Sequence, residues 1–276
     1  MKENYLENSF HKQFPEIETI TGPNSSEVSM SPERGGIITS LKFNGTEVLY
    51  LDEDTFNNTE LNVKGGIPIL FPNAGPLKEN SDFPNLKQHG FARNAQWKSE
   101  YNTEGFREEL ISNQQSKEIY PYDFNTSLEG AFETEGSFTI TQEVKNNEQN
   151  KELPIAMGLH PYFKVSNIEK ENIRFNFPGG DKVEQQVGLW SQGKAVSIDN
   201  PKVLNSDAVL KIEIPGIGTL VIDPSIEYQK IWVWSLPEKD FICIEPVMRD
   251  VNGLIENPQL VQPGENFTVN CNIKLI

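Results

Sequence analysis

The chain has 276 residues, a formal net charge of −16 and only two cysteines. Nucleic acids and anionic membrane surfaces are bound through basic patches, so this acidic composition argues against both partners. The first residues lack the apolar core of a secretory signal, and no run of about 18 apolar residues could cross a membrane. We therefore expect a soluble cytoplasmic protein. Cys243 and Cys271, each inside an apolar run, are expected to be buried and unpaired.

Alternation of apolar and polar residues dominates the chain. The first alternating run contains Leu41 and Phe43, and a second begins at Val48. The Asn-Gly pair 44–45 between them is a strong signal for a β-hairpin. Segment 107–116 fits a helix or a strand equally well. Four further runs place these apolar residues on one face of a strand: Phe138, Ile140 and Val144; Ile173, Phe175 and Phe177; Leu210, Ile212 and Ile214; Phe267, Val269, Cys271, Ile273 and Leu275.

Many short strands separated by turn residues predict an all-β fold, a large antiparallel β-sandwich or a barrel. No change of composition marks a linker, so we expect one domain over residues 1–276. Residues 1–20 are compatible with a peripheral N-terminal segment. His11 lies in this polar stretch and is expected to be exposed to solvent.

Segment 63–77, VKGGIPILFPNAGPL, combines glycines and prolines with an apolar centre. Gly65 and Gly66 permit backbone conformations that a Cβ atom would forbid. Two interpretations stay open: a tight turn into a buried strand, or a loop that forms one wall of a substrate site. In the second case Lys64 and Asn73 are candidate substrate-binding residues. The segment lacks the spacing of a phosphate-binding P-loop.

Two histidines stand in contexts typical of a functional site. His89 lies in the stretch 87–97, KQHGFARNAQW, four residues before Arg93. His160 precedes Pro161, which disfavours helix at the residue before it, so we expect His160 at the end of a strand. Two aromatic residues follow, and aromatic surfaces beside hydrogen-bonding groups suit sugars. Taken alone, either histidine is more often structural than functional.

Glu245 ends the apolar run FICIE and stands immediately before a proline. By alternation it shares a face with Phe241 and Cys243. A carboxylate on this apolar face is unfavourable unless it forms an ion pair or has a role in binding or catalysis. Burial would raise its pKa and make it a stronger base near neutral pH. The structural alternative is a salt bridge, for example with Arg93.

No metal site and no cofactor are predicted. The sequence contains no H-E-x-x-H motif and no cysteine pair at ligand spacing. The DVNG stretch at 250–253 lacks the later ligands of a calcium loop. A G-x-S-x-G nucleophile elbow is also missing.

Taken together, these segments resemble the aldose 1-epimerase (galactose mutarotase-like) family, in the branch that includes hexose-6-phosphate 1-epimerases. The motifs GGIPILFPNAGPL, QHGFARNAQW, YPYDF, MGLHPYFKV, CIEP and QPGE occur in the family's order. The resemblance extends from about Arg34 to the C-terminus. It implies a large antiparallel β-sandwich, or supersandwich, with the sugar in a cleft on one face.

The resemblance also implies a reaction and residue roles. Members interconvert the α and β anomers of a hexose by acid–base ring opening and closure, without a cofactor. It implies that His160 protonates the ring oxygen and that Glu245 is the base at the C1 hydroxyl. His89 would hydrogen-bond the sugar near the reacting centre. Arg93 would donate to a hydroxyl or a phosphate.

Departures from the family pattern leave the substrate open, as a sugar or a sugar phosphate. A Gly-Pro pair at 75–76 replaces the Gly-Arg of galactose-type members, and Lys64 stands where hexose-phosphate members often have arginine. Lys64 and Arg93 could still bind a phosphate, so a hexose-6-phosphate 1-epimerase is the alternative. Asp199 and Asp207 lie in about the right region for the family's sugar-binding aspartate, but the surrounding pattern differs.

Two rivals come from other functional classes. A non-catalytic carbohydrate-binding β-sandwich would need aromatic platforms but no matched acid and base. A glycoside-processing enzyme usually needs two carboxylates flanking one bond, and the sequence offers Glu245 alone in a convincing position.

Overall fold

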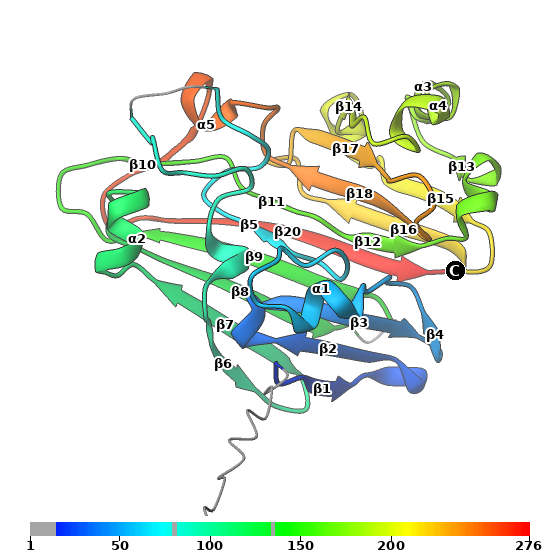
Figure 1. The fold of residues 1–276 in the computed structure, drawn as a ribbon, viewed down its shortest axis with the longest axis horizontal. Helices are drawn as coiled ribbons and strands as arrows, with labels where there is room; N and C mark the ends of the chain where they lie inside the picture. The colour runs from blue at the N-terminus through cyan, green and yellow to red at the C-terminus, as the bar shows by residue number, and fades with distance from the viewer. Residues whose placement is uncertain (1–14, 79–81, 134–135) are drawn as a thin grey trace, which may run out of the picture.

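The computed structural model describes residues 15–78, 82–133 and 136–276, and its regular elements are mainly antiparallel strands (Figure 1). This arrangement confirms the predicted all-β sandwich class. His11 and most of the segment 1–20 lie outside the described residues. No helix in the described ranges is long and apolar enough to cross a membrane.

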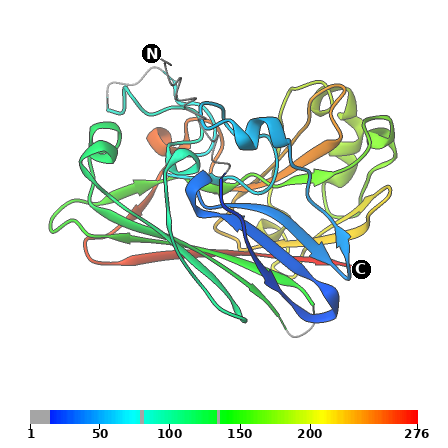
Figure 2. The same ribbon diagram turned by 60° about the horizontal axis from the view of Figure 1, so that its bottom comes forward.

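The largest sheet has eight strands and forms the lower layer in Figure 2. Alternation drives its formation: Phe138, Ile140 and Val144 are buried on one face of β9 (Phe138–Asn146), as predicted. The order of the strands is β13 (Arg174–Phe175), β15 (Leu210–Ile214), β16 (Gly218–Pro224), β20 (Asn266–Leu275), β9, β8 (Phe124–Phe132), β7 (Gly105–Ile111) and β6 (Lys98–Tyr101).

A six-stranded sheet packs over part of the first. Every residue of its strand β18 (Phe241–Val247) is buried. Ile242 and Ile244 join the main core, whereas Phe241 and Cys243 face the other side, in a cluster with Tyr162. The other strands are β14 (Val196–Asp199), β17 (Lys230–Trp234), β11 (Gly158–Leu159) and β5 (Ile69–Leu70), in the order β14-β17-β18-β11-β5, with β12 (Tyr162–Lys164) also paired to β18.

Two smaller sheets flank these layers. The predicted hairpin is confirmed: Asn44 and Gly45 both have positive φ angles, 51° and 80°, as the tight turn between twisted strands requires. One small sheet contains β1 (Glu18–Thr21), β2 (Glu27–Ser31), β3 (Ile37–Phe43) and β4 (Thr46–Glu47), and the other contains β10 (Leu153–Ile155) and β19 (Gln259–Val261).

The helices in the described ranges are short. The ambiguous segment 107–116 is divided: 107–111 belong to strand β7 and 114–116 to a helix, α2 (Gln114–Ile119). The helix begins after Asn113, whose side chain accepts from the Ser116 N–H. The other α-helices are α1 (Glu53–Asn57), α3 (Gly180–Gln185), α4 (Val187–Trp190) and α5 (Gly253–Glu256).

Strand β13 is shorter than the predicted run 173–177, although Ile173 and Phe175 are buried as expected. The Asn176 N–H still donates to Lys211 O (2.7 Å) on β15, but the Phe177 N–H donates back to Phe175 O (3.1 Å), and α3 begins at Gly180. Cys243 and Cys271 are both buried and free, as predicted.

Candidate active site

A cavity of about 540 Å³ opens beside β17 and β18. This volume lies within the roughly 300–1,000 Å³ of typical small-molecule sites. Five residues singled out from the sequence line it, although they are far apart in the chain: Lys64, His89, Arg93, His160 and Glu245.

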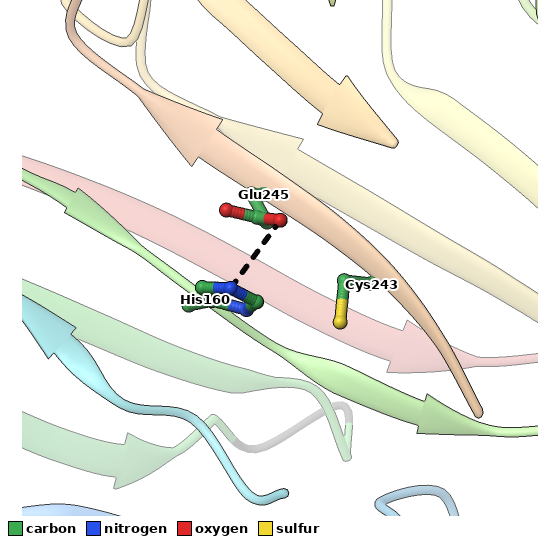
Figure 3. A group of neighbouring side chains, drawn as sticks. All are labelled: His160, Cys243 and Glu245. Carbon is green, nitrogen blue, oxygen red and sulfur yellow. Dashed lines mark ion pairs between the residues drawn. The ribbon is translucent and has the colours of Figure 1, made fainter. Parts of the chain in front are cut away.

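The floor of the cavity carries a histidine–carboxylate pair. His160 lies between β11 and β12, at a strand end as predicted, and Glu245 lies on the neighbouring strand β18. His160 Nε2 is 3.5 Å from Glu245 Oε1, and their side chains are only 7% and 3% exposed (Figure 3). The predicted alternative, a salt bridge between Glu245 and Arg93, is not found among the described residues.

Aromatic rings hold the imidazole of His160 in place. Tyr162 stacks on it with ring centroids 4.7 Å apart and an interplanar angle of 9°. Trp234 and His89 meet it edge to face, with ring centroids at 6.0 and 5.3 Å. The His160 N–H donates to Pro68 O (3.1 Å), so the backbone is fixed as well. The ring orientation is therefore set by packing before any substrate binds.

Burial shifts the proton affinity of both groups of the pair. It raises the pKa of Glu245 well above its usual range, against an opposing effect of the Arg93 charge. Burial also lowers the pKa of His160 well below its usual range, and charge on His89 and Arg93 adds to this. Glu245 Oε2 and His160 Nδ1 are buried without a hydrogen-bond partner among the described residues. Each group of the pair thus keeps one buried polar atom that no described protein group satisfies.

His89 projects from a tight turn that is tied to the loop opposite. His89 and Gly90 both have positive φ angles, 67° and 71°. The Gly75 N–H donates to His89 Nδ1 and the His89 N–H donates to Gly75 O, both at 3.0 Å. Burial, together with the charge of Arg93, lowers the pKa of His89 to about 3. Because Nδ1 accepts from the Gly75 N–H, neutral His89 carries its proton on Nε2, which lies 3.0 Å from the side-chain amide of Gln88.

Gly90 is the critical residue of this turn. A Cβ atom there would lie 1.9 Å from Phe71 O. We expect Gly90→Ala to destabilise the fold by more than the about 1–2 kcal/mol that left-handed backbone alone imposes on a side chain. Gly216 has a similar φ of +80° but open space around it, so Gly216→Ala is the matched control. Equal midpoints of urea unfolding for the two variants would contradict this expectation.

Arg93 lies in a 3₁₀ turn (Ala92–Asn94) directly after the His89 turn. Its Nη2 donates to Gln88 O (3.1 Å), while its Nε is buried without a partner among the described residues. Burial lowers the pKa of Arg93, but a guanidinium stays protonated in proteins. Arg93 is therefore a cation at the cavity wall that has hydrogen-bond donors available for a ligand.

Of the other two predicted binding residues, one lines the cavity and one does not. Lys64 is exposed and lines the cavity. Asn73 is fully buried and does not line it; its Nδ2 donates to Gly75 O (2.8 Å), so it supports the loop that contacts His89. A further lysine in the loop after β5, Lys78, forms an ion pair with Glu256 at 2.9 Å.

Sequence reasoning missed several lining residues. Trp232 and Trp234 alternate on β17, and Trp232 pairs with Glu245 across the strands. The repeated tryptophan in KIWVW is a signal that could have identified this wall. Asp250 lies just after β18 and gave no such signal. It accepts from Trp232 Nε1 (3.0 Å) and Ser197 Oγ (2.7 Å).

Asp250 is the better-placed candidate for the sugar-binding aspartate, because it lines the cavity. Asp199 and Asp207, the two considered from the sequence, do not line the cavity, and Asp199 pairs with Lys230 at 2.8 Å. Asp250 does line it, and its carboxylate also forms an ion pair with Lys230 (3.3 Å).

The fold defines the protein as a galactose mutarotase-like β-sandwich. The solved structure of the Slr1438 protein from Synechocystis sp. PCC 6803 is 26% identical, covers 99% of both chains and has a TM-score of 0.83. A galactose mutarotase related enzyme from Lactobacillus acidophilus shares the fold at 18% identity, covering 95% of this chain and 97% of its own, with a TM-score of 0.73. The aldose 1-epimerase family model matches residues 17–215, and the chain belongs to this family.

Two similar relatives carry the name "Putative glucose-6-phosphate 1-epimerase". The one from Cenchrus ciliaris is 26% identical over 267 residues, covering 84% of this chain and 77% of the relative. The one from Salmonella typhimurium strain LT2 is 31% identical over 226 residues, covering 73% and 72%. The chain is therefore an aldose 1-epimerase, an isomerase that interconverts the α and β anomers of a hexose, as predicted.

Proposed function

We propose that the protein anomerises its hexose in this cavity, with Glu245 as the base at the C1 hydroxyl and His160 as the acid at the ring oxygen. The 3.5 Å contact between the two buried groups supports this assignment. The two oxygens that must lose and gain a proton are bonded to the same carbon of the sugar. A single acid–base pair at one wall of the cavity can therefore reach both.

The directions of the two pKa shifts place the single proton of the pair on Glu245 at rest. In the reactive form this proton has moved to His160, which leaves a Glu245 carboxylate beside an imidazolium, and the charge of Arg93 favours that carboxylate. Glu245 takes the proton from O1 while His160 gives its proton to the ring oxygen, and the C1–O5 bond breaks to leave the aldehyde. After rotation about C1–C2, neutral His160 takes the proton back from O5. Protonated Glu245 then returns its proton to O1 as the ring closes on the other face. The His160–Glu245 pair holds one proton before and after the cycle, so the net charge of this buried pair does not change.

His89 and Arg93 assist by binding the substrate. Neutral His89 donates from Nε2 to a sugar oxygen beside the reacting carbon. Arg93 donates to a second oxygen and, through its charge, favours the ionised form of Glu245. Asp250 accepts from hydroxyl groups of the sugar, and the faces of Trp232 and Trp234 pack against the sugar C–H groups.

Direct measurement of anomerisation tests this function. Purified protein is added to freshly dissolved α-glucose, α-galactose and glucose 6-phosphate, and the approach to anomeric equilibrium is followed by polarimetry or one-dimensional NMR. We expect at least one sugar to equilibrate faster than in buffer with heat-denatured protein. Rates equal to the control for all three would reject the proposal for these sugars.

A phosphorylated hexose is the second candidate substrate, favoured by two cations in one cavity. Lys64 and Arg93 both line it. We expect Lys64→Ala to raise KM for glucose 6-phosphate about tenfold, because one charge-assisted contact to the phosphate is lost. KM for glucose should change by less than about twofold, because this substrate has no phosphate and Lys64 can make only a weak contact with it.

The matched control for Lys64 is Lys78→Ala. Lys78 belongs to the following loop, but its ammonium group pairs with Glu256. We expect this variant to leave KM unchanged for both sugars. An equal rise of KM for glucose and glucose 6-phosphate in Lys64→Ala would contradict a phosphate contact.

We further propose that the protein works in the cytoplasm as a single domain on a small-molecule sugar or sugar phosphate, without a nucleic acid or membrane partner. The net charge of −16 supports this assignment, because it repels polyanions. Cell fractionation with an antibody against the protein would check the location.

A further inference from the structure

Three potential metal ligands meet at the floor of the cavity. Cys243 lies two residues before Glu245 on the same face of β18, and His160 comes from the neighbouring β11–β12 connection (Figure 3). One ligand atom from each of the three side chains, a nitrogen, a sulfur and an oxygen, lies within 4.8 Å of the other two. All three residues are buried.

This donor set suits a thiophilic divalent cation. Zn²⁺ binds imidazole nitrogen, thiolate sulfur and carboxylate oxygen, and sites with three protein ligands keep a fourth position open. Bond lengths of about 2.0–2.3 Å place the ligand atoms of a tetrahedral site roughly 3.5 Å apart. The contact between His160 and Glu245 already has this length, 3.5 Å. Cys243 Sγ lies within 4.8 Å of the other two ligand atoms and would have to move closer to complete the set.

Two further observations point to a ligand at this place. Glu245 Oε2 is a buried polar atom without a hydrogen-bond partner among the described residues. Two anionic ligands, the carboxylate and a thiolate, would neutralise a divalent ion. A neutral cluster is the arrangement that a buried site tolerates best.

We propose that His160, Cys243 and Glu245 form a binding site for Zn²⁺ or a similarly thiophilic divalent cation, with its fourth position facing the cavity. Binding forms bonds from the metal to sulfur, nitrogen and oxygen, and it releases two protons to solvent: the Cys243 thiol proton and the proton that His160 and Glu245 share. The metal occupies lone pairs of the acid and the base, so it inhibits anomerisation. This inhibitory consequence rests on the proposed function, whereas the binding site itself does not.

Cobalt binding tests the site without any activity measurement. Full-length protein is freed of metal with a chelator and titrated with Co²⁺, which takes the geometry of Zn²⁺ and absorbs light. We expect saturation at one equivalent, with a thiolate-to-cobalt charge-transfer band that Cys243→Ala abolishes. Cys271→Ala is the matched control and should keep the band, because Cys271 is equally buried and free but lies on β20. Cys243→Ser serves the same purpose if the alanine variant does not fold.

Inhibition by Zn²⁺ is the second readout. For each variant the rate is compared with its own metal-free rate. We expect Cys243→Ala to need at least about tenfold more Zn²⁺ for half inhibition than the wild type or Cys271→Ala. Losing only a hydrogen-bond partner of a ligand typically costs about 10–100-fold in metal affinity, and losing the ligand itself should cost no less. A missing charge-transfer band in the wild type, or one that persists in Cys243→Ala, would overturn the site. The band without inhibition would retain the site and reject its link to the reaction. If the wild type shows no anomerisation, the proposed function fails while the cobalt result still decides the site.

Discussion

Replacing Glu245 with glutamine is expected to lower kcat by about 10²–10⁴-fold, the usual contribution of a positioned general base. Glutamine keeps the shape of the side chain and its contact with His160 but cannot accept the C1 proton. Because the chemical step is affected and the hydrogen-bonding surface is largely kept, KM should change little. Initial rates over a range of sugar concentrations, measured by polarimetry, separate the two constants.

Glu213→Gln is the control for this experiment. Glu213 is an exposed glutamate on β15, in the other large sheet. Its replacement should leave both constants unchanged. A Glu245→Gln variant with wild-type kcat would show that Glu245 is not the base. A variant that differs only in KM would place Glu245 in sugar binding instead.

The second large effect is expected on stability, at Glu108. This residue of β7 is completely buried, and neither carboxyl oxygen has a hydrogen-bond partner among the described residues. Burial, assisted by the charge of Glu18, raises the pKa of Glu108 from 4.5 to about 8. The folded protein therefore keeps a proton at neutral pH that the unfolded chain releases.

The sign of the pH dependence follows from this difference. Between the two pKa values, 4.5 and about 8, the folded state binds more protons than the unfolded state, so stability falls as the pH rises. Below this window Glu108 is protonated in both states and the penalty disappears. Glu108→Gln, which is neutral throughout, should remove this part of the slope. It should also raise the free energy of unfolding at neutral pH by about 3 kcal/mol.

Urea unfolding at about pH 5 and about pH 8 measures the slope for each variant. Glu100→Gln is the matched control, because Glu100 is an exposed glutamate on the adjacent strand β6. We expect this control to keep the wild-type slope. The same slope in Glu108→Gln would show that Glu108 is ionised in the folded protein.

The candidate site shows where prediction from sequence succeeded and where it stopped. His89, Arg93, His160 and Glu245 stand in recognisable motifs, and all four line one cavity. Asn73 stands in an equally recognisable motif but is buried under the loop, where it holds Gly75 O. A motif identifies a segment near the site, but the direction of each side chain depends on the packing around it.

Cys243 illustrates the same limit. Alternation places Cys243 on the same strand face as Glu245, and its apolar surroundings in the sequence predict only a small buried hydrophobic residue. Its position next to a histidine arises only because β12 pairs with β18 across a long stretch of chain. No ligand spacing in the sequence could indicate this neighbourhood.

The sequence by itself determined the all-β class, the hairpin at 44–45, the family and the segments that carry the catalytic candidates. These depend on local periodicity and on short motifs, which are properties of neighbouring residues. Only the tertiary structure decided that Trp232, Trp234 and Asp250 line the cavity and that His160 meets Glu245 at 3.5 Å. These contacts depend on the pairing of strands that are distant in the chain, which local patterns leave unspecified.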